Sequence, residues 1–299
     1  MSARALLAFG VLCAAPVLAQ QAPSEIVARS TGEEWVAIAP SDLLVMELKP
    51  LVGKPRRVVI QLMPAPFSQG WVGNLRTLAA AHWWDGLSIN RVQENYVVQW
   101  GDAASDDKKK AKALPAGLET VPASAYVVPV VAPLKGVLAI RDAYASQVGI
   151  TPDGWPFASD GKSYWPVHCF GAVGVGRDFP PDTGSGAELY VVDGHAPRHL
   201  DRNLGVVGRV IEGQEHLSSL PRGTGALGFY EKAAERVGIV SIRLGTEVKA
   251  LPAYEYLSPA SPGFTAYVEA RLNRKDPFFV TPAGGADLCN VPVPVRRVK

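Results

Sequence analysis

Hydrophobic residues recur along the chain mostly in short runs, which predicts a mainly β protein. The run at residues 57–62 is rich in β-branched side chains and stops before Pro64, as a strand does. Residues 87–100 alternate between apolar and polar side chains and indicate strands that end at a turn. Further short strands separated by Gly and Pro turns are expected at residues 170–175, 188–192 and 204–211.

Helical spacing is found in fewer places. Between residues 68 and 82 apolar positions recur every three or four residues, with Ser68 as the expected N-cap and Gly86 beyond the end. Shorter helices are expected at residues 140–148 and 213–220. The C-terminal sequence adds elements at residues 237–244 and 264–271 and then a Pro-rich tail.

Composition agrees with a soluble, turn-rich protein of one large domain or two small ones. The chain has 299 residues, of which 47% are hydrophobic and 19% are charged, values usual for globular proteins. The 25 prolines and 29 glycines favour a β protein over a helical one. Because the formal net charge is only +2, nothing indicates a nucleic-acid partner or an acidic membrane surface.

The N-terminus predicts export. Arg4 precedes an apolar stretch at residues 5–17, and the small-residue site ending at Ala19 is typical of signal-peptide cleavage. We therefore assign residues 1–19 to a signal peptide and expect a periplasmic protein without a membrane span after its removal. A lipoprotein modified at Cys13 and a retained membrane anchor are the alternatives.

Two cysteines remain after the predicted cleavage, Cys169 and Cys289. In an oxidising compartment an even pair is a candidate disulfide. The alternative is two separately buried thiols. On either interpretation the cysteines are structural and not catalytic.

Several local patterns match chemical motifs by letter but not by context. Residues 223–228 fit the GxGxxG dinucleotide fingerprint, yet no strand is predicted to lead into them. His195 and His199 have a metal-ligand spacing, but Pro197 lies between them and no acidic or cysteine cluster completes a site. Ser185 lacks the frame of a nucleophile elbow. We expect no metal, no cofactor and no hydrolase activity.

The most informative segment is residues 85–102, which read DGLSINRVQENYVVQWGD. It resembles the cyclophilin signature, in which Gly precedes a strand, then Phe-His-Arg, a turn and Phe-Met-x-Gln-Gly-Gly-Asp. Arg91, Gln99 and the closing Gly-Asp are in register with that signature. Residues 183–191 and 199–210 are similar, in the same order, to two further family stretches, Thr-Asn-Gly-Ser-Gln-Phe-Phe and Trp-Leu-Asp followed by Val-Phe-Gly-x-Val.

The resemblance implies an eight-stranded antiparallel barrel closed by two helices. On this basis residues 55–220 form the cyclophilin-like domain, interrupted by an insertion at 103–164. Residues 20–54 are then an N-terminal extension, and residues 221–299 are a C-terminal extension that packs on the barrel.

The resemblance also implies the site. Arg91 would be the catalytic donor to the prolyl nitrogen, Gln99 would hold Arg91 and the substrate carbonyl, and the backbone near Arg177 would anchor the residue before proline. The proposed substrate-binding residues are Tyr96, Val97, Gln99, Gly176, Arg177, Glu188, Tyr190, His199 and Leu200.

Some positions depart from the family pattern. Asn90 stands where the family has His, Val97 where it has Met, and His199 where it has Trp. Tyrosines at 96 and 190 replace two Phe residues, and their hydroxyls need partners if they are buried.

The expected function is cis–trans isomerisation of X–Pro bonds in exported polypeptides, which would aid their folding. The alternative is a catalytically weak cyclophilin-like module that binds Pro-containing segments as a chaperone or scaffold. A carbohydrate- or envelope-binding protein would rest only on exposed positions for Trp83, Trp84 and Trp155.

Overall fold

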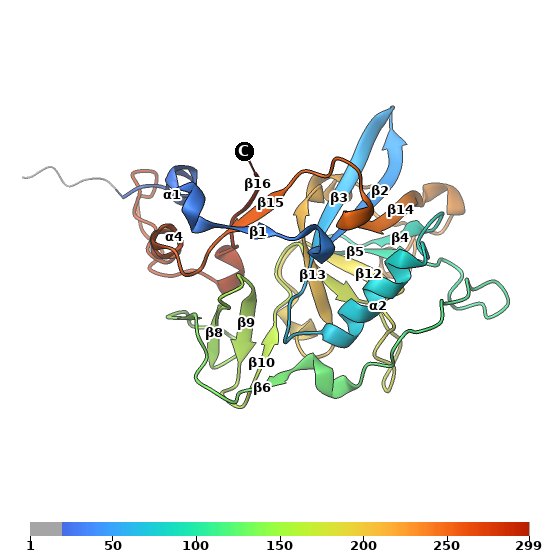
Figure 1. The fold of residues 1–299 in the computed structure, drawn as a ribbon, viewed down its shortest axis with the longest axis horizontal. Helices are drawn as coiled ribbons and strands as arrows, with labels where there is room; N and C mark the ends of the chain where they lie inside the picture. Colours follow the sequence, from blue (N-terminus) through green and yellow to red (C-terminus); the bar gives the residue numbers. More distant parts are fainter. Residues whose placement is uncertain (1–19, 299) are drawn as a thin grey trace, which may run out of the picture.

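Eight antiparallel strands close into a barrel at one end of the computed structural model (Figure 1), as the resemblance implied. The structure describes residues 20–298, so the predicted signal peptide lies outside the described residues. Around the barrel the strand order is β11-β12-β5-β4-β14-β2-β3-β13. The bounds are β2 Leu43–Leu51, β3 Lys54–Leu62, β4 Ser88–Val92, β5 Tyr96–Gly101, β11 Ala172–Val175, β12 Leu189–Asp193, β13 Val206–Glu212 and β14 Val237–Leu244.

The barrel takes one strand from each segment that the sequence assigned to an extension. β2 lies N-terminal and β14 lies C-terminal to the predicted domain, and the two strands pair with Met46 opposite Ile242. The predicted boundaries of 55–220 were therefore too narrow for the barrel. The short motifs that carry the resemblance lie between these two strands in the sequence, and the pairing of the strands is visible only once the barrel is closed.

Two helices pack into the same core as the barrel. In α2 (Gln69–Ala80) the side chains of Trp71 and Leu75 are completely buried against the barrel, and α3 (Gln214–Ser218) packs on β3. The prediction that Ser68 caps α2 was wrong, because its left-handed backbone, at φ 55°, leaves the side chain without a cap hydrogen bond. Within residues 20–298, no helix is both long and apolar enough to cross a membrane.

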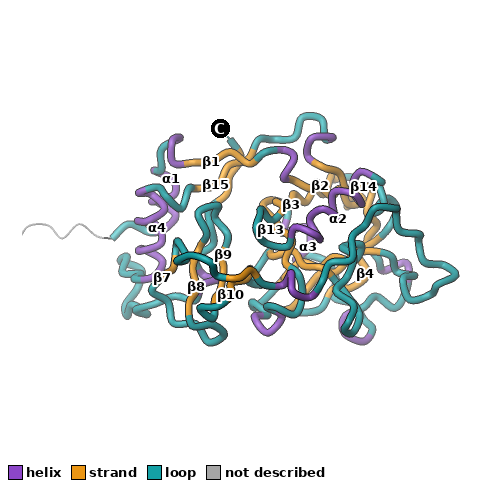
Figure 2. The backbone as a smooth tube through the Cα atoms, turned by 60° about the horizontal axis from the view of Figure 1, so that its bottom comes forward, coloured by secondary structure: helices purple, strands orange, loops and turns teal. Residues whose placement is uncertain are grey.

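A second lobe, made of residues 20–38, 127–169 and 253–298, lies beside the barrel (Figures 1 and 2). The helix predicted at 140–148 was wrong, because residues 140–146 form bends and irregular chain and a strand begins at Gln147, with Val148 and Ile150 packed in the same core. The elements of this lobe are α1 Pro23–Arg29, α4 Pro262–Leu272, β1 Trp35–Ile38, β15 Tyr254–Leu257, β16 Val295–Arg297, β6 Val128–Pro129, β7 Val137–Leu138, β8 Gln147–Ile150, β9 Pro156–Ser159 and β10 Ser163–Pro166.

The second lobe has its own hydrophobic core, to which all three segments contribute. Trp35 comes from the N-terminal segment, Trp165 from the insertion and Phe264 from α4. The sheet β6-β10-β9-β8-β7 lies between the two cores, because Phe157 packs in the barrel core while Ala158 packs in the second core. The insertion is therefore held from both sides.

A disulfide joins Cys169, just before β11, to Cys289 in the C-terminal segment, with their Cα atoms 5.1 Å apart. The predicted pair is thus present. It spans 120 residues, and a bridge of that span contributes on the order of 2–5 kcal/mol to stability. Trp83, Trp84 and Trp155 are buried, which removes the basis of the carbohydrate-binding alternative.

Candidate active site

Adjacent barrel strands place Arg91, Gln99 and Tyr190 in one row. The register sets Gln99 opposite Arg91 on β4 and opposite Tyr190 on β12, so the three are cross-strand neighbours. Because Val98 next to Gln99 points into the barrel core, the row lies on the outer face. Gly174 continues the row on β11, where an added Cβ would lie 2.2 Å from the Tyr190 ring, so glycine leaves the space that this ring occupies.

An open cleft of about 820 Å³ lies over this row. The first loop of the insertion forms one rim through Ala103 and Lys112, and Leu227, Phe229 and Tyr230 form another rim. The insertion therefore lines the cleft instead of covering it. Six of the residues implied by the resemblance line the cleft together: Arg91, Gln99, Gly176, Arg177, Glu188 and Tyr190.

The other four predicted residues lie outside this lining. The Tyr96 ring centroid is 5.7 Å from the guanidinium carbon of Arg91, and the His199 ring stacks on Tyr96 at 6.2 Å between centroids. Val97 is buried in β5, and Leu200 is half-buried in a short helical turn. Tyr96 and His199 thus extend the surroundings of Arg91.

The guanidinium of Arg91 is held by three acceptors. Nη1 donates to Gln99 Oε1 at 3.2 Å, Nε donates to the Leu227 carbonyl oxygen at 2.7 Å, and Nη2 donates to Gln93. Of the five N–H groups of a guanidinium, these contacts leave one on each terminal nitrogen. Partial burial lowers the pKa of Arg91, but its ordinary value is so high that the group stays protonated at neutral pH.

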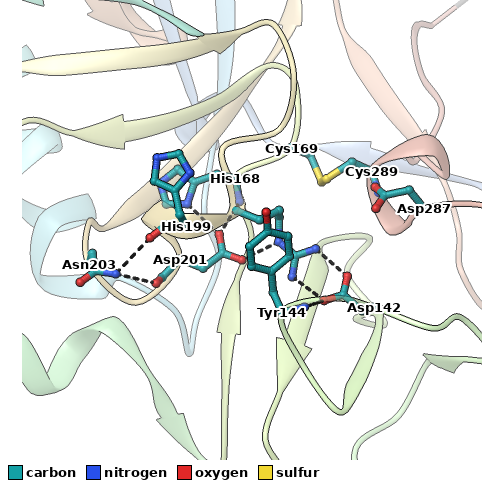
Figure 3. A network of polar contacts seen from close by, with 10 residues as sticks. Asp142, Tyr144, His168, Cys169, His199, Asp201, Asn203, Asp287 and Cys289 are labelled. Atoms are coloured by element: carbon teal, nitrogen blue, oxygen red, sulfur yellow. Dashed lines mark hydrogen bonds and ion pairs between the residues drawn. A yellow bond between two sulfur atoms is a disulfide. The ribbon is translucent and has the colours of Figure 1, made fainter.

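A buried polar network supports the floor of the cleft. The Tyr190 hydroxyl lies 2.8 Å from His168 Nε2, and His168 Nδ1 lies 2.9 Å from Asp201 Oδ1. Because a carboxylate only accepts, Nδ1 carries the proton and the Tyr190 hydroxyl donates to Nε2 when the ring is neutral. Asp201 also accepts from Arg198, which pairs with Asp142 of the insertion (Figure 3).

This network resembles a nucleophile-histidine-carboxylate triad in its contacts, but its chemistry differs. Burial raises the pKa of the Tyr190 phenol well above its ordinary value, so the hydroxyl keeps its proton. His168 is completely buried. The network therefore positions the Tyr190 ring, and it satisfies the hydroxyl that distinguishes this residue from Phe.

Comparison with protein families decides to which family the chain belongs. Residues 54–244, more than half of the chain, match the family described as cyclophilin type peptidyl-prolyl cis-trans isomerase/CLD. The chain belongs to the cyclophilin family. As a member, it is a peptidyl-prolyl cis-trans isomerase whose substrates are proline-containing polypeptides.

One solved structure agrees on the fold of this cyclophilin. The chain is similar to the crystal structure of cyclophilin AquaCyp293 from Hirschia baltica, with a TM-score of 0.63 and 19% identity over 88% of this chain and 96% of that one. A cyclophilin type isomerase from Cryptosporidium parvum matches with a TM-score of 0.41 and 11% identity, over 68% of this chain and 96% of that one. No curated protein matches the sequence.

Glu188 is the unusual ionisable group of the cleft. Burial raises the pKa of its carboxyl from 4.5 to about 7, even though the backbone N–H of Asp102 donates to it at 2.7 Å. The charges of Asp102 and Asp106 act in the same direction as burial. The carboxyl reaches this place because Gly101 has no side chain, since a Cβ there would lie 2.1 Å from it.

This raised pKa predicts that stability falls with pH. In the unfolded chain Glu188 ionises near 4.5, whereas in the fold it stays protonated up to about 7. The folded state therefore binds more protons between these values, and stability present below 4.5 is lost as the pH rises through 7. The loss is at most about 3 kcal/mol.

Urea unfolding at intervals from pH 4.5 to 8 measures the effect. We expect Glu188→Gln to flatten the curve and to be more stable than the parent at pH 8, because the amide does not ionise. Glu33→Gln, an exposed carboxylate far from the cleft, should leave the parent curve unchanged. An equally steep curve for Glu188→Gln would contradict the assignment.

Sequence reasoning missed one buried residue beneath the cleft and two residues that line it. His168 carries no local signal, because it meets Tyr190 only after the barrel closes. Leu227 belongs to the glycine-rich stretch 223–228 that was set aside as a failed nucleotide motif, and Phe229 follows it directly. Its glycines were a usable signal for a tight loop, but nothing in the sequence places that loop against Arg91.

Proposed function

We propose that Arg91 catalyses the isomerisation of X–Pro bonds in exported polypeptides and so speeds their folding. Rotation about this bond is slow because the amide is partly double-bonded, with a barrier of roughly 18–20 kcal/mol. As the amide twists, the prolyl nitrogen regains its lone pair. A donor aimed at that nitrogen is therefore bound more strongly in the transition state than in the ground state.

The observation that carries this proposal is the row of Arg91, Gln99 and Tyr190 beneath an open cleft. Gln99 fixes the guanidinium through Nη1 and leaves N–H groups for a substrate. A guanidinium suits the task because it remains protonated and has a fixed planar donor geometry. Tyr190, held by His168, forms a rigid aromatic floor.

The substrate runs across the row in this proposal. Gly176 and Arg177 take the backbone of the residue before proline, since they line the β11 side of the cleft opposite Arg91. The proline ring lies near Tyr96 and His199, which stack on each other beside Arg91. Glu188 lines the cleft at the other end of β5, beside Asp102, while Val97 and Leu200 lie outside the cleft lining.

Two features support action on exported polypeptides. The N-terminal sequence has the pattern of a signal peptide, and the disulfide is of a kind that persists in oxidising compartments such as the periplasm. The second lobe, which has its own core, favours the chaperone or scaffold alternative, because it adds surface that isomerisation itself does not need.

The test is catalysed refolding of a secreted polypeptide whose slow phase is limited by X–Pro isomerisation. The protein comprising residues 20–299 should accelerate that phase in proportion to its concentration. In a separate test of export, the chain recovered from the exported fraction should begin at Gln20. Binding of the unfolded polypeptide without acceleration would establish the scaffold function instead. Recovery from the cytoplasm with residues 1–19 attached would contradict export.

A further inference from the structure

The glycine-rich stretch 223–229 forms a tight loop that lies directly against β4. Gly223 N–H donates to the Val92 carbonyl at 2.9 Å, and Tyr230 N–H donates to the Asn90 carbonyl at 2.9 Å. Between them, Phe229 forms an antiparallel bridge with Arg91. The loop is therefore added to the edge of the strand that carries the catalytic arginine.

The glycines are what allow this approach. An added Cβ at Gly228, which has φ +82°, would lie 2.7 Å from the Gln93 Cα, and one at Gly223 would lie 1.9 Å from the Gly228 carbonyl oxygen. Side chains at these places would push the loop off β4 or prevent its turn. The GxGxxG pattern at 223–228 follows α3 and not a strand, so it is not a nucleotide-binding motif. Its glycines are explained by the close contact with β4.

The loop presents two large apolar side chains to the cleft. Leu227 is 67% exposed and Phe229 is 41% exposed, and both line the cleft beside Arg91. The Phe229 ring centroid is 5.4 Å from the Arg91 guanidinium carbon, and the Leu227 carbonyl accepts from Arg91 Nε. Single exposed apolar residues are ordinary. Two of them on one loop that is hydrogen-bonded to β4, within a cleft, form an apolar surface that a ligand can bind.

We propose that Leu227 and Phe229 form a specificity wall that binds an apolar side chain on the residue after proline. The inference rests on the proposed function, in which Gly176 and Arg177 hold the residue before proline on the β11 side of the row. The loop lies on the β4 side, at the other end of the row. A peptide that crosses Arg91 therefore meets the loop with the residue that follows proline.

The test measures affinity by NMR titration, which needs no turnover, for peptides Ala-Ala-Pro-Z with Z as Leu, Phe, Ser or Asp. The parent should bind the Leu and Phe peptides about 5- to 10-fold more tightly than the Ser peptide. This is the gain in affinity expected when one apolar side chain is partly buried on binding. Leu227→Asn combined with Phe229→Ser should reduce this ratio to less than about 2-fold. Asn suits position 227 because it tolerates the left-handed backbone there, at φ 56°.

Two further variants make the result specific. Gly228→Ala keeps both side chains but displaces the loop, so it should lower the ratio as well. Val240→Asn removes an apolar side chain that is 51% exposed on β14 outside the cleft lining, so it should leave the ratio unchanged. A ratio retained in the double variant overturns the wall even if the protein is an active isomerase. Conversely, the parent could show the expected binding ratio and its loss in the double variant, but no isomerase activity. That result would support the wall and refute only the catalytic proposal.

Discussion

We expect Arg91→Ala to lower kcat/KM for a short X–Pro peptide by roughly 10²- to 10³-fold, the loss typical when a preorganised donor is removed from the site of developing charge. The guanidinium is fixed by Gln99 and by the Leu227 carbonyl before substrate binds, so little reorganisation is needed during rotation. A coupled protease assay, in which only the trans peptide is cleaved, measures the change. Most of it should fall on kcat, because the contact to the prolyl nitrogen forms only as the amide twists.

Arg57→Ala is the matched control for this variant. Arg57 on β3 forms an ion pair with Glu47 on β2, with 2.6 Å between Arg57 Nε and Glu47 Oε1. Neither residue lines the cleft. Its substitution should leave kcat/KM within about twofold of the parent, since neither residue of this partly buried pair lines the cleft. A loss of activity equal to that of Arg91→Ala would mean that general basic charge is responsible and not the placement of Arg91.

The second large effect concerns stability. Arg198→Met should lower the free energy of unfolding by about 3–5 kcal/mol, because it leaves two buried carboxylates without their cation. Arg198, Asp142 and Asp201 have side-chain exposures of 3%, 2% and 5%, so water cannot replace the lost partner. Urea unfolding should show a lower midpoint at an unchanged slope.

An exposed ion pair serves as the control for Arg198. Arg76 contacts Asp42 at 2.9 Å with both side chains well exposed, and Arg76→Met should change stability by no more than about 1 kcal/mol. Equal losses for the two variants would contradict the role given to burial. Because Asp142 lies in the insertion and Asp201 beside the cleft, the network also joins the insertion to the barrel.

The parts of the site that sequence predicted are those close together in the chain. Arg91 and Gln99 belong to one hairpin, so their relation follows from strand spacing and local motif alone. The expectation that a buried Tyr190 hydroxyl needs a partner was also correct, since it follows from the cost of burying an unpaired polar group. These conclusions require no knowledge of how distant segments meet.

The parts that sequence missed depend on long-range packing. Leu227 is 136 residues from Arg91, and only the closed barrel brings its carbonyl to the guanidinium. The pairing of β2 with β14 likewise joins segments from opposite ends of the chain, which moved the barrel boundaries beyond the motif region. The helix expected at residues 140–148 is instead irregular chain that leads into β8 at Gln147, because a short apolar run does not distinguish helix from strand or loop.

The central claim is that Arg91 lowers the barrier to X–Pro rotation in a bound peptide. NMR exchange spectroscopy on a short X–Pro peptide tests it most directly, because it measures cis–trans interconversion on the protein separately from binding. The account predicts rapid interconversion with the parent, and binding without measurable interconversion with Arg91→Ala. Interconversion at the parent rate in Arg91→Ala, or none with the parent despite binding, would contradict it.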